Sequence, residues 1–248
     1  MIRYAVKIFR FLFTAWATLV FTGIMLAFLP FIILPPLFGH RAAAVTFLFL
    51  KIWSWLLSKL IFVHYEIRGN HHLKRFHPCI YVSNHTSFLD LPGLSIAIPG
   101  QFRPLAKKEL LKIPVFGWVV ACATIVVDRS SAESRSQSLI NLKKILKMDI
   151  PALIFPEGTQ NRSEQLLQPF KDGAFRMALE TMVPVIPVAI SGAGTLMPPG
   201  KFSIRPGKIY IEFGEPILPE NFKDMQVADL NTLTFERIRS MLISLPKK

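Results

Sequence analysis

Residues 152–159 read Ala-Leu-Ile-Phe-Pro-Glu-Gly-Thr. The first four form a continuous apolar run, which is typical of a strand covered on both faces, because a strand with one wet face alternates polar and apolar side chains. Residues 123–127 (Ala-Thr-Ile-Val-Val) have the same character and are followed by Asp128 and Arg129. Such strands predict a mostly parallel or mixed sheet flanked by helices, which is the α/β fold class.

Short β-rich runs and helical patterns alternate outward from these two strands. Apolar residues recur with helical spacing in a segment that begins near Ser131, in residues 173–182 and in residues 227–245. The sequence has no internal repeat and no long linker, so we predict that residues 63–248 form one domain. Further strands are expected at residues 63–67, 79–82, 102–106, 184–190 and 208–213.

The first 62 residues have a different composition. No acidic residue precedes Glu66, and residues 11–39 carry no charge. Residues 11–29 would form a helix about 28 Å long at about 1.5 Å per residue, close to the thickness of a hydrocarbon core. We expect Pro30 and the two prolines behind it to stop or bend this helix. A secretory signal has a shorter apolar part and a cleavage site, so we expect the segment to be retained.

A second apolar segment covers residues 42–63. Its polar residues Lys51, Ser54, Ser58 and Lys59 fall within an arc of about 140° on a helix, a pattern typical of a helix lying at a membrane interface. Spanning and monotopic arrangements both stay open. Residues 1–62 are therefore predicted to be a two-helix membrane-embedded or interfacial segment that precedes the α/β domain.

The charge balance narrows the classes of partner. The chain has 29 Lys and Arg, 16 Asp and Glu, a net charge of +13 and 51% hydrophobic residues. This combination favours an anionic membrane surface and anionic substrates. It argues against nucleic acid, because the basic residues are interleaved with apolar sequence. Arg3, Lys7 and Arg10 predict attachment at the cytoplasmic face, which is the inner membrane if the protein is bacterial.

Cysteines and histidines predict neither a disulfide framework nor a metal site. The two cysteines lie in apolar runs and are expected to be reduced and buried. The histidines between residues 64 and 77 fit no tetrahedral zinc spacing, and the basic residues among them repel a cation.

Residues 84–90 (Asn-His-Thr-Ser-Phe-Leu-Asp) follow an apolar strand and carry a candidate base. The carboxylate of Asp90 can accept a hydrogen bond from one imidazole nitrogen of His85, which leaves the other nitrogen free to take a proton from a hydroxyl. From the residues alone, Asp90 is equally a helix cap, supported by Pro92, and His85 a loop histidine.

Polar residues follow three other predicted strands. Glu157, Gly158 and Arg162 come directly after the apolar run of residues 152–155, and a carboxylate, a glycine and a cation together can hold a polyhydroxyl or phosphate group. Lys107 and Arg129 stand at two further strand ends, where either side chain can meet an anion. Structural turns and surface ion pairs explain each of these places equally well when it is taken alone.

Together, these motifs resemble those of the membrane-bound glycerolipid acyltransferases, and are most similar to the bacterial 1-acyl-glycerol-3-phosphate acyltransferases. The resemblance covers about residues 63–215, and its blocks occur in the family's order. They are Asn-His-x4-Asp at residues 84–90, a strand ending in Asp-Arg at 126–129, Phe-Pro-Glu-Gly-Thr at 155–159 and Val-Pro-Val-Ile-Pro-Val at 183–188.

This resemblance implies an activity: transfer of an acyl chain from acyl-CoA or acyl carrier protein to the sn-2 hydroxyl of 1-acyl-glycerol-3-phosphate, giving phosphatidic acid. It implies His85 as the base and Asp90 as its orienting carboxylate. It implies no metal and no cofactor apart from the thioester co-substrate. The expected substrate-binding residues are Asn84, Lys107, Arg129, Glu157, Gly158, Thr159, Gln160 and Arg162.

The sequence departs from the family at Gln160, where arginine is usual. Glutamine brings no charge to a phosphate, although Arg162 lies only two residues away. A different lyso-lipid acceptor, such as a lyso-aminolipid, therefore stays open, as do a thioesterase and a non-catalytic membrane adaptor. The sequence does not specify the acyl-chain length, the donor or the oligomeric state.

Overall fold

Residues 2–71, 73–128 and 132–246 are described by a computed structural model. In these ranges the strands form one mixed sheet in the order β1-β7-β6-β2-β5-β3-β4. All neighbours are parallel except β6 and β7. The strands are β1 (Val63–Arg68), β2 (Ile80–Ser83), β3 (Arg103–Lys107), β4 (Ile125–Val127), β5 (Ala152–Ile154), β6 (Val185–Ser191) and β7 (Gly207–Phe213).

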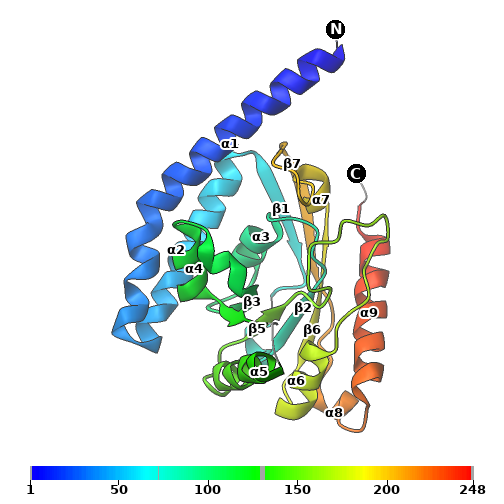
Figure 1. Ribbon diagram of the computed structural model, residues 1–248. Coiled ribbons are helices and arrows are strands. Elements are labelled where there is room, and N and C mark those ends of the chain that lie inside the picture. The colour runs from blue at the N-terminus through cyan, green and yellow to red at the C-terminus, as the bar shows by residue number, and fades with distance from the viewer. Residues whose placement is uncertain (1, 72, 129–131, 247–248) are drawn as a thin grey trace.

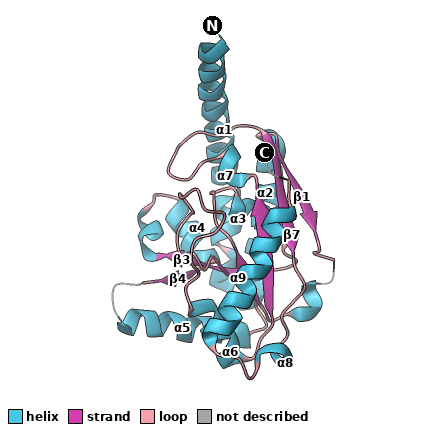
Figure 2. Cartoon of the chain, turned by 90° about the vertical axis from the view of Figure 1, so that its right-hand side faces the viewer, coloured by secondary structure: helices cyan, strands magenta, loops and turns pink. Residues whose placement is uncertain are grey.

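Helices cover both faces of this sheet, as Figure 1 shows. One apolar core lies between the sheet and α1–α4, and a second lies between the sheet and α5, α6 and α9. Figure 2 shows α9 crossing the second face. The helices are α1 (Ile2–Ile33), α2 (His40–Leu60), α3 (Asp90–Ala97), α4 (Phe116–Ala123), α5 (Ala132–Lys147), α6 (Gly173–Thr181), α7 (Ala193–Leu196), α8 (Pro219–Phe222) and α9 (Val227–Ser244), with 3-10 turns at Pro35–Phe38, Leu73–Phe76 and Lys108–Lys112.

The predicted fold class is confirmed, and the continuous apolar runs explain it. β2 and β5 are buried along their whole length, which requires a covered sheet on both sides. The expected strands agree with the observed ones to within a residue at each end. Antiparallel pairing of β7 with β6 makes the sheet mixed.

Helix α1 is longer than the sequence indicates. It continues through Pro30 to Ile33. Pro30 has no N–H to donate to the carbonyl of Leu26, so the helix loses one intrahelical bond but is not ended by it. The N–H of Leu34 still donates to the carbonyl of Pro30 at 3.1 Å, so the helix closes one turn later than expected.

Helix α2 packs against α1, α3 and β1. Ser54 and Ser58, predicted as part of a polar face, are 1% and 6% exposed. Because these side chains are small, the α2 backbone can approach its neighbours closely on that face. The large side chains of Ile52 and Trp55 are instead exposed. The polar arc therefore lies partly in the protein interior, unlike the polar face of an interfacial helix.

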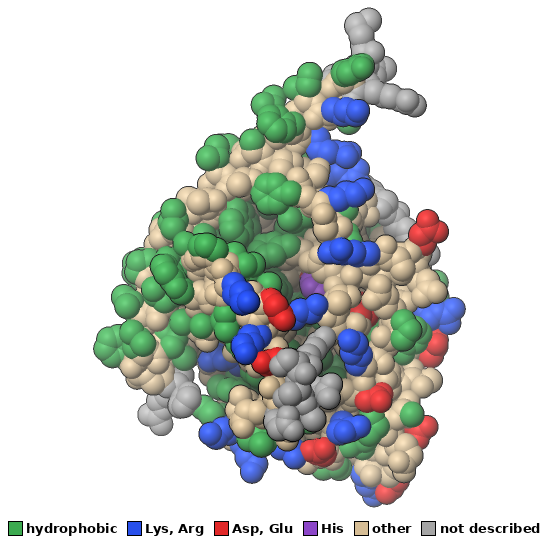
Figure 3. All heavy atoms as spheres, in the orientation of Figure 1, with side chains coloured by type: hydrophobic (Ala, Val, Ile, Leu, Met, Phe, Trp, Pro, Cys, Tyr) green, Lys and Arg blue, Asp and Glu red, His purple; other side chains and the backbone are tan. Residues whose placement is uncertain are grey.

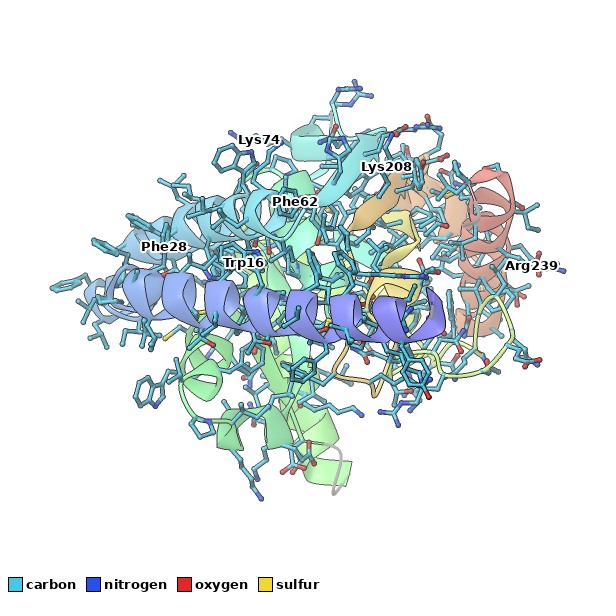
Figure 4. The ribbon with its side chains drawn as sticks, turned by 90° about the horizontal axis from the view of Figure 1, so that it is seen from above. Trp16, Phe28, Phe62, Lys74, Lys208 and Arg239 are labelled. Atoms are coloured by element: carbon cyan, nitrogen blue, oxygen red, sulfur yellow. The ribbon has the colours of Figure 1, made fainter. Side chains whose placement is uncertain are left out.

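The two N-terminal helices run beside each other and keep a large apolar surface. Figure 4 shows Trp16 and Phe28 along α1, and the indole N–H of Trp16 donates to the carbonyl of Leu60 at 3.0 Å. Residues 6–38 and 42–60 are each long and apolar enough to cross a membrane. The exposed large apolar side chains of α1 include Phe9, Phe11, Leu12, Trp16, Leu19, Leu26 and Phe31. The division into residues 1–62 and 63–248 stays a prediction.

Candidate active site

Strand β2 ends in the loop that carries the candidate base. Asn84, the first residue after β2, is 1% exposed. Its amide donates to the carbonyl of Ile190 at 2.9 Å and accepts from the N–H of Ile190 at 2.8 Å. The side chain predicted to bind substrate thus lies inside the sheet, where it fixes the end of β2 to β6.

His85 and Asp90 are in direct contact. Nδ1 of His85 lies 2.8 Å from Oδ2 of Asp90, a carboxylate with no exposed surface. The same oxygen accepts the N–H groups of Thr86 at 2.8 Å and Ser87 at 2.9 Å. Asp90 is the first residue of α3 and its carboxylate bonds back to the loop, so it does not have the helix-cap role that the sequence left open as an alternative. The carboxylate orients the loop and its histidine.

The imidazole of His85 is held by a ring as well as by the carboxylate. It stacks on the ring of Phe155 with centroids 4.1 Å apart, and its side chain is 16% exposed. When Nδ1–H donates to Asp90, Nε2 carries a lone pair and can accept a proton. This arrangement is that of a general base with a buried orienting carboxylate.

Glu157 joins the loop after β5 to the loop after β2, since these two strands are neighbours. Oε1 accepts the N–H of His85 at 2.9 Å, and Oε2 accepts the N–H of Gln168 at 3.0 Å. The side chain is buried, and burial raises the pKa of this carboxyl, while the two N–H bonds act in the opposite direction. Both oxygens are thus used to position backbone.

The other residues of this loop differ in exposure, from the buried Asn161 to the exposed Thr159 and Arg162. Gly158 has a φ of +79°, in the left-handed region that favours glycine. Thr159 is exposed, Gln160 is half-buried, and the N–H of Asn161 donates to the carbonyl of His85 at 2.7 Å. The Arg162 guanidinium lies 3.2 Å from where a Cβ on Gly200 would stand, so it faces the segment after α7.

Of the two remaining predicted residues, Lys107 lies farther along the sheet edge. Lys107 ends β3 and is exposed, with β5 between it and β2. Arg129 lies outside the described residues. The preceding carboxylate of Asp128 accepts a bond from Lys108 Nζ at 2.9 Å. The roles of these residues in binding stay predictions.

Sequence reasoning missed two features of this site. The ring of Phe155 packs against the imidazole, which the apolar residue before Pro-Glu-Gly-Thr signals only once β2 and β5 are known to be neighbours. Gly194 of α7 faces Thr86, with a Cβ position 3.1 Å from the Cβ of Thr86. No sequence pattern indicated that α7 packs on this loop.

An apolar cavity of about 180 Å³ lies beside the loop of residues 84–90, which we call the catalytic loop because it carries the candidate base. Phe88 and Leu89 of that loop line it together with Phe21 of α1, Leu57 of α2 and Ile204. Hydrocarbon is therefore the chemistry that this cavity accepts. Within the described ranges, no group of three or more His, Cys, Asp or Glu side chains is arranged to hold a metal ion.

The fold and the His–Asp pair define an α/β protein with a candidate general base at the carboxyl edge of its parallel strands. The sequence profile of the acyltransferase family matches residues 64–191, just over half of the chain. The chain belongs to the acyltransferase family.

Individual relatives agree with this assignment. A chloroplast 1-acyl-sn-glycerol-3-phosphate acyltransferase of Brassica napus is 34% identical over 170 residues, which are 67% of this chain and 48% of that one. The alpha form of this enzyme from Bos taurus is 30% identical over 199 residues, 79% of this chain and 67% of that one. The chain thus spans about half to two thirds of the length of these relatives.

A solved structure has the same fold. The 1-acyl-sn-glycerophosphate acyltransferase PlsC of Thermotoga maritima superposes with a TM-score of 0.82 at 23% identity, covering 98% of this chain and 99% of that one. The likeness extends over α1 and α2 as well as the sheet.

Proposed function

We propose that this protein transfers an acyl chain from acyl-CoA or acyl carrier protein to the sn-2 hydroxyl of 1-acyl-glycerol-3-phosphate, giving phosphatidic acid. The observation that carries the proposal is the 2.8 Å contact of His85 Nδ1 with the buried Asp90 carboxylate. The activity for which these relatives are named supports the choice of reaction.

The reaction needs one base and no enzyme nucleophile, because a thioester is already activated. Nε2 of His85 takes the hydroxyl proton as the hydroxyl oxygen attacks the thioester carbonyl carbon. The tetrahedral adduct then loses its thiolate, and the imidazolium returns the proton to sulfur. A C–O bond forms, a C–S bond breaks and His85 ends neutral. Asp90 stabilises the imidazolium of His85 during the time that the ring holds the hydroxyl proton. No metal or further cofactor enters this scheme.

The acceptor is proposed to bind beside the loop after β5, which carries the cation Arg162. Glu157 contributes by holding the loop, since both of its oxygens bond backbone N–H groups. Gln160 supplies no charge, which supports a second candidate acceptor, a lyso-lipid with a different headgroup.

The site is proposed to work at a membrane surface on the cytoplasmic face. α1 exposes a row of large apolar side chains, and the same helix carries Lys7 and Arg10 near its N-terminal end. A lipid acceptor would then reach the loop without leaving the membrane.

The test is an assay of the purified full-length chain with labelled acyl thioester and a panel of lysolipids. His85→Ala should lower kcat at least about 100-fold, and Asp90→Asn about 100- to 10,000-fold, with little change in KM. Combining the two should add little to the larger loss, because the residues act as a unit. Glu66→Gln, an exposed carboxylate on β1, is the control and should retain full activity.

The product distinguishes the alternatives. Phosphatidic acid formed from lysophosphatidate supports the proposal, and product from another lysolipid alone moves the acceptor to that class. Fatty acid released without any lysolipid product indicates a thioesterase. Full activity of His85→Ala removes the mechanism, and lipid binding without turnover of any thioester indicates an adaptor.

A further inference from the structure

Helix α1 and residues 197–206, the segment between α7 and β7, line a second cavity, of about 150 Å³. Three cationic side chains line it: Arg10 from α1, and Lys201 and Arg205 from the segment. Ser203 and Thr195 add polar atoms, Leu196 and Pro198 complete the lining, and no acidic side chain of the described residues lines it. We call it the basic cavity.

The walls of the basic cavity are fixed by hydrogen bonds. Nε of Arg205 donates to the carbonyl of Thr195 at 2.9 Å. The N–H of Ile204 donates to Oγ1 of Thr14 at 3.2 Å, which ties the segment to α1. Residues 190 positions apart in the chain are thereby held together before any ligand binds, so the backbone on both sides of the cavity is preorganised, while the side chains of Arg10 and Lys201 are exposed.

The cations of the basic cavity have no carboxylate partners in the described part of the chain, where the ion pairs involve other side chains. Like charges brought to one cavity repel, and the repulsion is relieved by an anion that all of them can contact. Guanidinium and ammonium groups are the side chains that proteins use to bind phosphate.

The basic cavity adjoins the apolar cavity beside the catalytic loop, since Ser203 lines both. Figure 3 shows Lys and Arg side chains in a row down from the projecting end of α1, next to a hollow lined with hydrophobic side chains. Two neighbouring cavities, one cationic and one apolar, match a molecule with a phosphate headgroup and a hydrocarbon chain.

We propose that the basic cavity binds the phosphate ester of a glycerophospholipid whose acyl chain enters the adjoining apolar cavity. This places a phosphate site outside residues 157–162, the loop from which the sequence predicted phosphate binding. The lipid is either the acceptor itself or a lipid of the bilayer. Its assignment as the acceptor rests on the proposed function, whereas binding of a bilayer lipid does not.

The variant that tests this site is Arg10→Gln/Lys201→Gln in the full-length chain. Both side chains are exposed, and Arg205 keeps its bond to Thr195. The matched control is Lys144→Gln/Lys223→Gln, which removes the same charge near α5 and α8 at the other end of the molecule (Figure 1). Binding of lysophosphatidate and of monoacylglycerol, which lacks the phosphate, is measured in detergent without an acyl donor. Flotation with vesicles of phosphatidylcholine, with and without phosphatidate, is measured in parallel.

We expect the double variant either to bind lysophosphatidate about tenfold more weakly or to lose the extra binding to phosphatidate vesicles. The first result, with a raised KM for lysophosphatidate, assigns the acceptor, and the second assigns a bilayer lipid. Monoacylglycerol binding and the control variant should be unchanged.

Three results would overturn the inference: both measurements unchanged, an equal loss of monoacylglycerol binding, or an effect confined to the KM for acyl-CoA. These outcomes are separate from the proposed function. If no thioester is turned over by the wild-type chain, the proposed reaction fails, while the binding measurements still decide the phosphate site.

Discussion

Carboxylates at this site are used to hold backbone as well as side chains. One oxygen of Asp90 accepts two loop N–H groups and faces the histidine ring, and Glu157 accepts the N–H of His85 itself. The spacing of five residues between His85 and Asp90 predicted their contact. The contact of Glu157 with His85 was not predicted, because it depends on the lateral order of the strands.

The buried carboxyl of Glu157 gives a prediction about pH. Burial raises its pKa above the ordinary value of 4.5, against the opposing N–H bonds of Gln168 and His85. Stability from a group with a raised pKa is present in full below the unfolded pKa and is lost as the pH rises through the folded one. Relative to Glu157→Gln, which does not titrate, the wild-type free energy of unfolding should therefore fall as the pH rises above the ordinary carboxyl pKa of 4.5.

Urea unfolding in detergent over this pH series measures the difference. A constant difference, or one that grows with pH, would mean that the N–H bonds balance or outweigh burial.

In kinetics, a positioning role predicts that Glu157→Gln lowers kcat and leaves the KM for lysophosphatidate nearly unchanged. A raised KM alone would mark Glu157 as a ligand of the acceptor.

At the scale of elements, α3 fixes the carboxylate of Asp90 by packing closely on β1. A Cβ on Gly93 would stand 2.5 Å from the ring of Tyr65, whose hydroxyl donates to the carbonyl of Leu89 at 2.9 Å. Leu89 directly precedes Asp90. The close approach of α3 to β1 therefore sets the position of Asp90 and its carboxylate.

Gly93→Ala should separate α3 from β1 and so disturb Asp90. We expect a loss of about 1–3 kcal/mol in the free energy of unfolding, which is typical of overpacking, together with a lower kcat. Gly23→Ala in α1 is the control, because nothing lies within 4 Å of its Cβ position. It should be neutral or stabilise by up to about 1 kcal/mol. Urea unfolding and the acyl transfer assay measure both variants, and equal behaviour of the two would contradict the packing argument.

The two N-terminal helices show which features of an element the sequence can predict. Their existence and apolar character followed from composition. Which face of α2 is buried did not, because small polar residues such as Ser54 and Ser58 are compatible with a wet face and with a tight helix contact.

At the scale of the whole molecule, the apolar face of α1 lies on the side of the sheet opposite α9. Leu12 and Leu19 are 60% and 71% exposed there. An exposed apolar patch on one side orients the molecule relative to a membrane, because that side would be the one in contact with lipid.

Leu12→Asp/Leu19→Asp should release the protein from vesicles, since each charge costs roughly 2.5–3.5 kcal/mol at the centre of a membrane helix. Ile243→Asp on α9, where the side chain is 57% exposed, should leave vesicle binding unchanged. Flotation of the detergent-free protein with vesicles measures both. Equal retention of the two variants on vesicles would show that α1 is not the attachment surface.

The sequence by itself determined the covered sheet, the two apolar helices and the His–Asp pair, because each depends on burial or spacing within a short stretch of chain. Only the tertiary structure decided the strand order, which brings Glu157 to His85, and the antiparallel pairing of β7. It also decided the joining of Arg10 to Lys201 and Arg205 across one cavity. The physical reason is that these contacts join distant segments. They are selected by the packing of whole elements, which leaves no local pattern in the residues themselves.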